Sequence, residues 1–347
     1  MLSTLPRPEA RRRNFSRPRP LRPPGEAPAQ AAAARLGGGP DFVRGALRRA
    51  GGSILRVEVL IGVPEGKVAT ATFPLILKGV CERAEIEARA RAELGGMTIS
   101  VRCEAPDGFH PERADEEAPR PGDRDLHGII LVYPFAHSAV ASLLRRNRAV
   151  SVLESYDGLD IDAVDTDDEA AVSALVGSLH EAGHSRIGFL SWDYPVGGHW
   201  VARRFNGFAT GMCARGHGIN GDWVINAGSG PRLSAEEAAD KAARAVRDVG
   251  VTAWVCAADH QAYHLIKSLE SRGIRVPRDC SVTGFDGLEA PAGLPLAASA
   301  RVAHEHIGSS ALTRMINRIL YPSSSSRRIL VSAHPVPGET IAAPRQP

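Results

Sequence analysis

Features that would mark a membrane protein or a common class of enzyme are missing from the sequence. No run of eighteen apolar residues occurs, so we expect no membrane-spanning helix. The serine-nucleophile motif G-x-S-x-G and the phosphate-binding Walker loop are absent, and Gly228-Ser229-Gly230 is only a lone glycine-rich turn. Asp165, Asp167 and Asp168 are clustered, but capping explains carboxylates at a helix start. The sequence therefore predicts a binding protein and not an enzyme.

Cysteine spacing argues against the usual metal and disulfide frameworks. The chain has five cysteines, none of them spaced as C-x-x-C: Cys81, Cys103, Cys213, Cys256 and Cys280. Buried, reduced thiols of a cytoplasmic protein are the simplest interpretation. We expect no metal site and no cofactor.

Charge is unevenly distributed along the chain. The net charge of +3 is too small to indicate nucleic-acid binding by itself. Residues 1–30, however, hold seven Arg, two Glu and seven Pro, a composition that predicts disorder because it cannot build an apolar core. Arg12-Arg13 is similar to the start of a twin-arginine export signal, but no apolar stretch follows it, so we expect a cytoplasmic location.

From about residue 54, short runs rich in Val and Ile alternate with segments of helical periodicity. Runs that are apolar on both faces indicate strands of a parallel sheet covered by helices. We expect strands at residues 57–63, 98–103, 128–133, 150–153, 187–191, 252–257 and 281–285.

Helical periodicity and end signals predict helices at residues 168–182, 233–249, 259–272 and 305–320. We expect Asp165 or Thr166 to cap the first helix and Gly183 to end it in a left-handed conformation. By the same logic Ser234 begins the second helix and Gly273 ends the third. Strands that alternate with helices predict an α/β fold with parallel sheets. Periodicity alone allows either one large sheet or two sheets of about six strands that form two lobes with a cleft between them.

Five segments, in order along about 280 residues, resemble the effector domain of LacI/GalR transcription regulators. They are residues 125–131 (DLHGIIL), 164–167 (VDTD), 183–190 (GHSRIGFL), 204–208 (RFNGF) and 273–286 (GIRVPRDCSVTGFD). The resemblance implies a two-lobed periplasmic-binding-protein-like fold, in which each lobe is a parallel sheet flanked by helices and a ligand cleft lies between the lobes.

The resemblance also implies domain boundaries. The ligand-sensing domain spans residues 54–341. Its N-lobe covers about residues 57–184 plus 298–325, and its C-lobe covers about residues 185–297 plus 326–341. Residues 342–347 form a tail.

Ligand contacts are implied at five positions: Phe73, Arg204, Trp223, Asp259 and Asp286. Arg204 matches a family arginine that grips ligand hydroxyls or carboxylates, and Asp286 matches a carboxylate that accepts ligand hydrogen bonds. Phe73 and Trp223 match aromatic positions, the second of which stacks on the ligand ring. Structural alternatives stay open, since Arg204 can pair with a nearby acid, Trp223 can belong to the core and Asp259 can cap a helix.

Two departures from the family pattern argue against carrying over a ligand identity. Ala258 stands where the family usually has an asparagine, and an alanine side chain cannot form a hydrogen bond with a ligand. A loop that is usually small and polar is filled with large side chains, namely Trp192, Tyr194, His199 and Trp200. The pocket is therefore expected to be unusual.

Residues 31–53 resemble the end of the family's DNA-binding domain and its hinge helix. Residues 34–41 (ARLGGGPD) are similar to the exit from that domain, and residues 42–47 (FVRGAL) are similar to the hinge. By this resemblance Leu47 is the apolar wedge that enters the DNA minor groove, and Arg44 and Arg48 contact phosphates.

The helix-turn-helix pattern of the family is absent before residue 30. Six prolines from Pro6 to Pro24 are incompatible with three packed helices. Three explanations stay open. The start is mis-assigned or frameshifted, the DNA-binding module is lost, or the Arg/Pro-rich arm binds DNA non-specifically.

The implied function is a ligand-responsive, DNA-binding transcription regulator that senses a small metabolite, a sugar or a related compound, in the cleft. The implied partners are this carbohydrate-like effector, operator DNA and a second copy of the chain in a homodimer, with no membrane. The alternative is a solitary cytoplasmic small-molecule-binding protein that has lost DNA binding.

Overall fold

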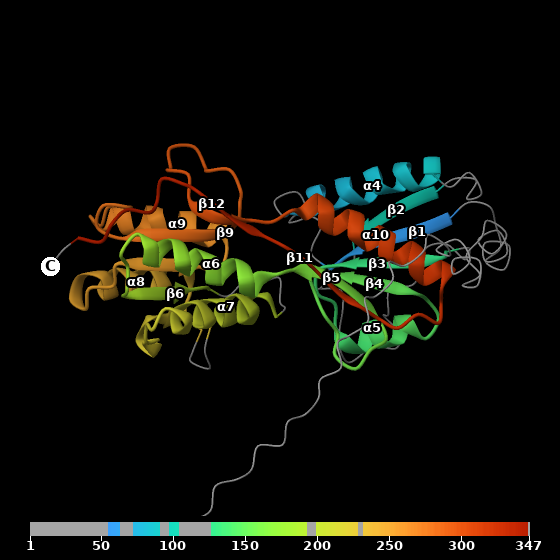
Figure 1. The fold of residues 1–347 in the computed structure, drawn as a ribbon, viewed down its shortest axis with the longest axis horizontal. Coiled ribbons are helices and arrows are strands. Elements are labelled where there is room, and N and C mark those ends of the chain that lie inside the picture. Colours follow the sequence, from blue (N-terminus) through green and yellow to red (C-terminus); the bar gives the residue numbers. More distant parts are fainter. Residues whose placement is uncertain are drawn as a thin grey trace, which may run out of the picture. The chain divides into compact units, whose positions relative to one another are not determined.

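A computed structural model describes residues 55–62, 72–90, 97–103, 126–192, 199–227 and 232–345. These residues form two six-stranded sheets with helices on both faces (Figure 1). The α/β prediction is confirmed, and of the two arrangements that periodicity allowed, the two-sheet one is correct. The expected disordered segment 1–30 and the hinge segment 31–53, with Arg44, Leu47 and Arg48, lie outside the described residues.

The first sheet is parallel in all of its described pairs. Its strands are β1 (Leu55–Ile61), β2 (Met97–Cys103), β3 (Gly128–Val132), β4 (Ala149–Val152), β5 (Asp162–Thr166) and β11 (Arg328–Val331), in the order β11-β5-β4-β3-β1-β2. Alternate side chains leave opposite faces, as strand geometry requires. Val57 and Val59 pack toward α4 (Phe73–Ala90) and α10 (His304–Leu320), whereas Leu60 packs toward α5 (His137–Leu144). We call this sheet with its helices the first lobe.

The second sheet is parallel except for the antiparallel pairing of its edge strand β12. Its strands are β6 (Ile187–Leu190), β7 (Val224–Ile225), β8 (Ala253–Cys256), β9 (Ser281–Asp286), β10 (Ala298–Arg301) and β12 (His334–Val336), in the order β12-β10-β9-β8-β6-β7. Helices α6 (Asp168–Glu181) and α7 (Trp200–Ala214) cover Phe189 on one face. Helices α8 (Ala235–Asp248) and α9 (Asp259–Ser271) cover Leu190 and Trp254 on the other. We call this unit the second lobe.

All seven expected strands are present, but periodicity missed five further strands in the described part of the chain. Strand β5 shows why, because its sequence DAVDT looks too polar for a buried strand. Asp162 is nevertheless fully buried, since its carboxylate oxygens lie 2.9 Å from Nε of Arg314 and 3.3 Å from Nε of Arg318. Ion pairs formed with a distant helix make these acids compatible with the core, and no local pattern reveals such partners.

The chain passes between the sheets three times, and the expected lobe boundaries are wrong at each passage. The passages follow β5, β10 and β11, and thus lie near residues 167, 302 and 332. The sequence placed them after residues 184, 297 and 325. Helix α6 packs on α7 although it follows a strand of the first sheet, β10 pairs with β9, and β11 pairs with β5. Pairing partners, which are non-local, decide these boundaries.

The expected tail is also wrong in part, because its first residues are attached to the second lobe. The amide of Ala342 donates to Oγ of Ser281 at 3.1 Å, and its carbonyl accepts from the ring of His184 at 2.8 Å. Arg345 forms an ion pair with Asp279 at 2.7 Å.

Most of the predicted helix ends are confirmed. Ser234 forms a reciprocal capping box with Glu237 at the start of α8. Gly183 and Gly273 have positive φ angles of 99° and 77° just after α6 and α9. The cap of α6 is neither Asp165 nor Thr166, which still belong to β5. It is Asp167, whose side chain accepts a hydrogen bond from the amide of Ala170. No described helix combines the length and the apolar composition that a membrane crossing needs.

Helices α4 and α10 touch through glycines. A Cβ atom on Gly308 would lie 2.0 Å from the carbonyl oxygen of Ile76, and one on Gly79 would lie 1.9 Å from the carbonyl oxygen of Glu305. Backbone atoms cannot move aside as a flexible side chain can. The contact that covers the first sheet therefore depends on glycine at both positions.

We expect Gly308→Ala to lower the free energy of unfolding by about 1–3 kcal/mol, because overpacking outweighs the better helix propensity of alanine. Urea denaturation measures the change. Gly218→Ala is the matched control, since nothing lies within 4 Å of a Cβ atom there, and it should shift stability by less than about 0.5 kcal/mol. Equal effects of the two substitutions would refute the close helix contact.

Candidate ligand-binding site

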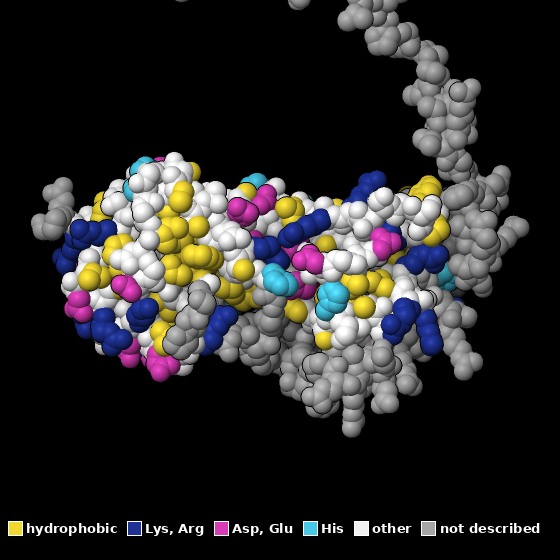
Figure 2. Space-filling view, turned by 90° about the horizontal axis from the view of Figure 1, so that it is seen from below, with side chains coloured by type: hydrophobic (Ala, Val, Ile, Leu, Met, Phe, Trp, Pro, Cys, Tyr) yellow, Lys and Arg dark blue, Asp and Glu magenta, His cyan; other side chains and the backbone are white. Residues whose placement is uncertain are grey.

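A cavity of about 130 Å³ lies at the carboxyl ends of the strands of both sheets. In open α/β sheets this is the edge at which ligands bind. The cavity wall consists of Thr72, Tyr133, Pro134, Leu153, Asp165, Thr166, Asp168, Trp200, Arg203, Arg204, Ala258, His260, Asp286, Leu288, Val302 and His304. Figure 2 shows that charged and histidine side chains gather in the middle of one face of the molecule, with hydrophobic side chains to either side.

Three wall residues have left-handed backbone conformations that are unusual for side chains other than glycine. They are Tyr133, Leu153 and Asp286, with φ angles of 68°, 64° and 120°. Tyr133 and Leu153 directly follow β3 and β4, and Asp286 ends β9. Backbone strain of this kind costs about 1–3 kcal/mol per residue and concentrates at functional sites. The strand ends therefore bend where their side chains meet the cavity.

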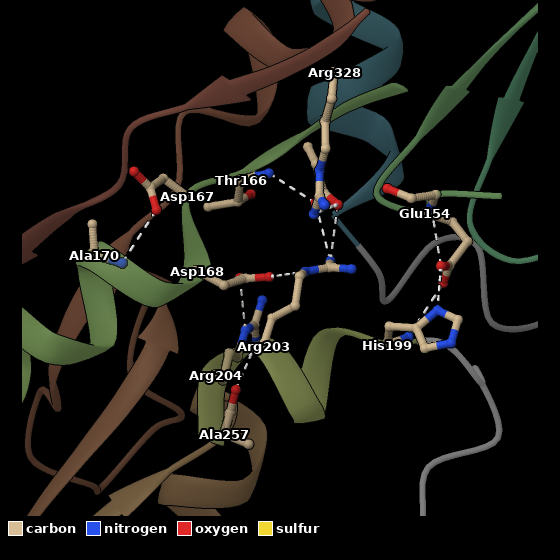
Figure 3. Close-up of polar contacts among 12 residues, drawn as sticks. Glu154, Thr166, Asp167, Asp168, Ala170, His199, Arg203, Arg204, Ala257 and Arg328 are labelled. Atoms are coloured by element: carbon tan, nitrogen blue, oxygen red, sulfur yellow. Dashed lines mark hydrogen bonds and ion pairs between the residues drawn. The ribbon is translucent and has the colours of Figure 1, made fainter. Parts of the chain in front are cut away.

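Two adjacent arginines of α7 share one carboxylate on the cavity wall. Nε of Arg203 lies 2.9 Å from Oδ2 of Asp168, and Nε of Arg204 lies 3.0 Å from Oδ1 of the same residue. Arg203 also contacts Asp165 of β5 at 3.0 Å. Figure 3 shows both guanidinium groups approaching Asp168 from α7. The network joins the first sheet, the start of α6 and α7 through charge-assisted hydrogen bonds.

Arg204 is fixed further by four other contacts. Its Nη1 donates to the carbonyl of Ala257 at 2.6 Å, and its Nη2 lies 3.5 Å from Oδ1 of Asp286. The guanidinium lies over the rings of Phe285 and Trp200, with its carbon 3.7 Å and 4.9 Å from the ring centroids. Planar guanidinium groups stack well on aromatic faces. Arg204 is thus a rigid, preorganised donor on the cavity wall.

Burial dominates the ionisation of two acids on the cavity wall, Asp286 and Asp165. It raises the pKa of Asp286 to about 7, although the charge of Arg204 opposes this shift. Burial likewise raises the pKa of Asp165 against the opposing charge of Arg203. Asp286 therefore changes its charge near neutral pH, while it remains within reach of any ligand in the cavity.

Comparison with known proteins gives consistent results for sequence and structure. Residues 176–341 match the periplasmic binding protein-like domain family. The chain is 32% identical over 155 residues to the HTH-type transcriptional repressor PurR of Photobacterium profundum, covering 44% of this chain and 45% of that protein. It is 29% identical over 238 residues to the HTH-type transcriptional regulator MalR of Streptomyces coelicolor, covering 67% of this chain and 65% of that one.

The chain is thus similar to transcriptional regulators and contains a periplasmic binding protein-like domain, in agreement with its resemblance to the LacI/GalR family. Its match spans about half the length of the PurR relatives. The fold agrees with a crystal structure of a LacI family transcriptional regulator from Enterococcus faecium with bound ribose. That structure has a TM-score of 0.62 and 18% identity, and the superposition covers 84% of this chain and 100% of the other. The family resemblance and the two-lobed fold inferred from the motifs are confirmed.

Of the five predicted ligand contacts, Arg204 and Asp286 meet on the cavity wall. Phe73 is not on that wall, because it is a buried core residue at the start of α4, beside the wall residue Thr72. Trp223 lies in the short helix Gly221–Trp223, where it packs half-buried against the core beneath α8 and α9. The structure therefore favours the structural alternative for Trp223, which packs against the core and does not line the cavity.

Asp259 is fully buried behind the wall and does not cap α9. Its carboxylate accepts hydrogen bonds from Oγ of Ser299 and from the amide of Leu288, both at 2.6 Å. Gly284 makes room for it, since a Cβ atom there would lie 2.0 Å from Oδ1 of Asp259. The residue at the N-cap position is Ala258, which provides no side-chain cap. Asp259 therefore braces the segment after β9 that leads to β10.

Several wall residues were not among the predicted contacts. Asp168 and Arg203 were missed because capping explained the acid and no motif marked the arginine. The hydroxyls of Thr72 and Tyr133 lie 3.1 Å apart, and their sequence surroundings show no periodic signal. Trp200 was noted only as part of a bulky loop, but it begins α7 and contacts Arg204. Its adjacency to the Arg-Phe-Asn-Gly-Phe segment is the signal that could have revealed it.

One segment matches the letters of the zinc motif H-E-x-x-H without forming its geometry. It is residues 180–184, His-Glu-Ala-Gly-His, and the motif requires both histidines on one helix face. Here α6 ends at Glu181, and Gly183 turns the chain with a positive φ. His180 bonds to His217, whereas His184 bonds to Thr252. No group of three or more potential metal ligands occurs among the described residues.

His304 gives the stability of this protein a testable pH dependence. Burial lowers its pKa to about 4, and the charge of Arg204 adds to the effect. The unfolded chain, with an ordinary pKa of about 6.5, binds a proton that the folded chain does not. Stability is therefore present above pH 6.5 and is lost as the pH falls toward 4. From His304 alone the loss is about 3 kcal/mol at roughly 1.36 kcal/mol per pKa unit.

We expect His304→Gln to flatten the decrease in unfolding free energy between pH 6.5 and 4, measured by urea titration at several pH values. His334→Gln is the control because His334 is exposed, and it should keep the wild-type slope. Asp286 acts with the opposite sign, since its raised pKa lowers stability as the pH rises through 7. Asp286 is present in wild type and in both variants, so its contribution cancels when each variant's profile is subtracted from the wild-type profile. Identical slopes for all three proteins would contradict the assignment.

Proposed function

We propose that this chain is a ligand-responsive, DNA-binding transcription regulator whose effector binds in the cavity between the two lobes. The observation that carries the proposal is the approach of Arg204 to Asp286, 3.5 Å apart, on a cavity wall made by both sheets. The curated relatives, named as transcriptional repressor and regulator, support the DNA-binding part. Residues 180–184 match the letters of a zinc-enzyme motif but do not form its geometry, which agrees with a sensing role.

The charges on the wall favour a neutral, polyhydroxylated effector such as a sugar. Asp165, Asp168 and Asp286 supply three carboxylates, whereas Arg203 and Arg204 supply two guanidinium groups that are already paired with them. A phosphorylated or carboxylated ligand would add negative charge without a free counter-charge on this wall. Hydroxyl groups donate to carboxylates and accept from arginine, so they suit this mixed surface. The ribose bound to the Enterococcus faecium neighbour agrees with this class.

Effector binding would act by population shift. The cavity wall includes residues beside two of the three passages between the lobes, Thr166 and Asp168 at the first, Val302 and His304 at the second. A ligand that contacts both lobes binds the arrangement that brings its contacts together more tightly than any other. In a homodimer that preference would be transmitted to the hinge segment, where we propose that Leu47 enters the minor groove and Arg44 and Arg48 contact phosphates.

Asp286→Asn is the sharpest test of the effector site. A thermal-shift screen of pentoses, hexoses, disaccharides and nucleosides identifies a ligand, and calorimetry then gives its Kd. We expect the substitution to weaken binding roughly ten- to a hundredfold, since a hydrogen bond to a charged group contributes about 1.5–3 kcal/mol. Wild-type binding should tighten as the pH rises through 7, because the ionised carboxylate accepts ligand hydroxyls, and the variant should lose this dependence.

Asp222→Asn serves as the control for the same chemical change at an exposed position away from the cavity wall. It should leave both the Kd and its pH dependence unchanged. If Asp286→Asn binds the identified sugar as wild type does, Asp286 is not a ligand contact. If a phosphorylated sugar binds more tightly than its neutral counterpart in the cavity, the proposed effector class is wrong.

DNA binding is tested by electrophoretic mobility shift with the full chain and the DNA upstream of its own coding region. We expect a shift at low salt that weakens steeply as salt rises, because phosphate contacts release counterions. The identified effector should change the midpoint of the titration. Failure to bind, together with an intact response to the effector, would favour the solitary binding protein over the regulator.

A further inference from the structure

A second hollow, of about 710 Å³, lies at the opposite end of the second sheet from the effector cavity. It is bounded by the residues that precede β6, β8 and β9, and by the carboxyl ends of α6, α8 and α9. Gly183, Gly250 and Gly273, all with positive φ, line it just after those helices. The four-residue strand β6 alone separates the two ends of the sheet by roughly 13 Å, at about 3.3 Å per residue. The hollow is therefore distinct from the effector cavity.

Four arginines from four different segments line this hollow, with Asp279 as its one acidic lining residue among those described: Arg186, Arg247, Arg275 and Arg345. Asp279 is shared, since Nε of Arg275 lies 2.9 Å from one of its oxygens and Nη1 of Arg345 lies 2.7 Å from the other. Hydrogen bonds from Arg275 lower the pKa of Asp279 to about 2, so it stays ionised. Asp279 offsets one of the four arginine charges, so a surplus of three positive charges remains.

Arg186 and Arg247 hold most of this surplus without a carboxylate partner in the described part of the chain. The Nη1 of Arg186 donates to the carbonyl of Val249 at 3.4 Å, and the Nη2 of Arg247 donates to the carbonyl of Arg272. A guanidinium has five N–H donors. Each of these side chains therefore has donors left after its contact with the protein.

Capping of helix ends explains where these two arginines lie but not how many charges gather here. Val249 and Arg272 are the C-cap residues of α8 and α9, and cations stabilise such ends. A helix end carries about half a negative charge. Three helix ends together offset roughly half of the surplus, so the hollow remains positive by more than one elementary charge.

We propose that this hollow is a binding site for a small multivalent anion, an inorganic or organic phosphate, separate from the effector cavity. Guanidinium forks that approach from several sides suit the several oxygens of a phosphate group. The concave shape favours a small ligand over an extended polyanion. The contrast with the effector cavity is chemical, since there carboxylates outnumber arginines and here arginines outnumber carboxylates.

Calorimetric and thermal-shift titration of the full chain with inorganic phosphate, pyrophosphate and citrate, at constant ionic strength set with chloride, tests the proposal. We expect saturable binding of phosphate and pyrophosphate, with pyrophosphate the tighter. Arg186→Gln and Arg247→Gln should each weaken the Kd at least tenfold. Arg244→Gln is the matched control because Arg244 is exposed on the same helix as Arg247 but does not line the hollow, and it should bind as wild type does.

Three results would overturn the proposal. They are the lack of saturable phosphate or pyrophosphate binding at millimolar concentration, tighter binding of citrate than of pyrophosphate, and equal binding by the Arg186→Gln and Arg247→Gln variants and wild type. Asp286→Asn, which alters the effector cavity, should leave phosphate binding intact. Loss of phosphate binding in that variant would show that the anion binds in the effector cavity and not in the hollow. Far-ultraviolet circular dichroism checks folding. Should Arg186→Gln not fold, Arg186→Lys keeps the charge without the fork and is expected to bind with intermediate affinity.

Discussion

One buried carboxylate, shared by a buried and a half-buried guanidinium group, holds the cavity together. Asp168 begins α6 directly after the chain leaves the first sheet, and both of its oxygens accept from α7, through Arg203 and Arg204. The two helices can come this close because Gly207 faces the backbone of Glu169, where a Cβ atom would lie 2.5 Å from the carbonyl oxygen. Removing one partner from such a buried network typically costs about 3–5 kcal/mol, because the other charge is left unpaired.

This network also sets the chemistry that the cavity offers. Arg203 and Arg204 are held by acids, so the cavity wall has its donors and acceptors already arranged, and its carboxyl groups outnumber its guanidinium groups. Burial brings the pKa of Asp286 to about 7 in the same environment. The opposite end of the second sheet has the reverse balance, with arginines around the carboxyl ends of three helices. The second sheet thus separates two surfaces of different electrostatic character.

The site could be predicted from the sequence only where a residue lies in a recognisable segment. Arg204 and Asp286 lie in such segments, and the structure brings them together at 3.5 Å. Asp168 was attributed to capping, because a carboxylate at a helix start has a sufficient local explanation and its partners are 35 and 36 residues away. Trp223 and Asp259 also lie near family positions, yet Trp223 packs half-buried against the core and Asp259 braces the turn after β9. A position in the sequence does not specify the direction of a side chain.

The sequence by itself determined the α/β class, seven of the strands, the ends of the main helices at residues such as Ser234 and Gly183, and the resemblance to a known family. These features depend on local periodicity, capping and short motifs, which neighbouring residues encode. Only the tertiary structure decided where the chain passes between the two sheets and which acids and arginines share the cavity. Those features depend on strand pairing and buried ion pairs between residues far apart in the chain, for which the local pattern contains no signal.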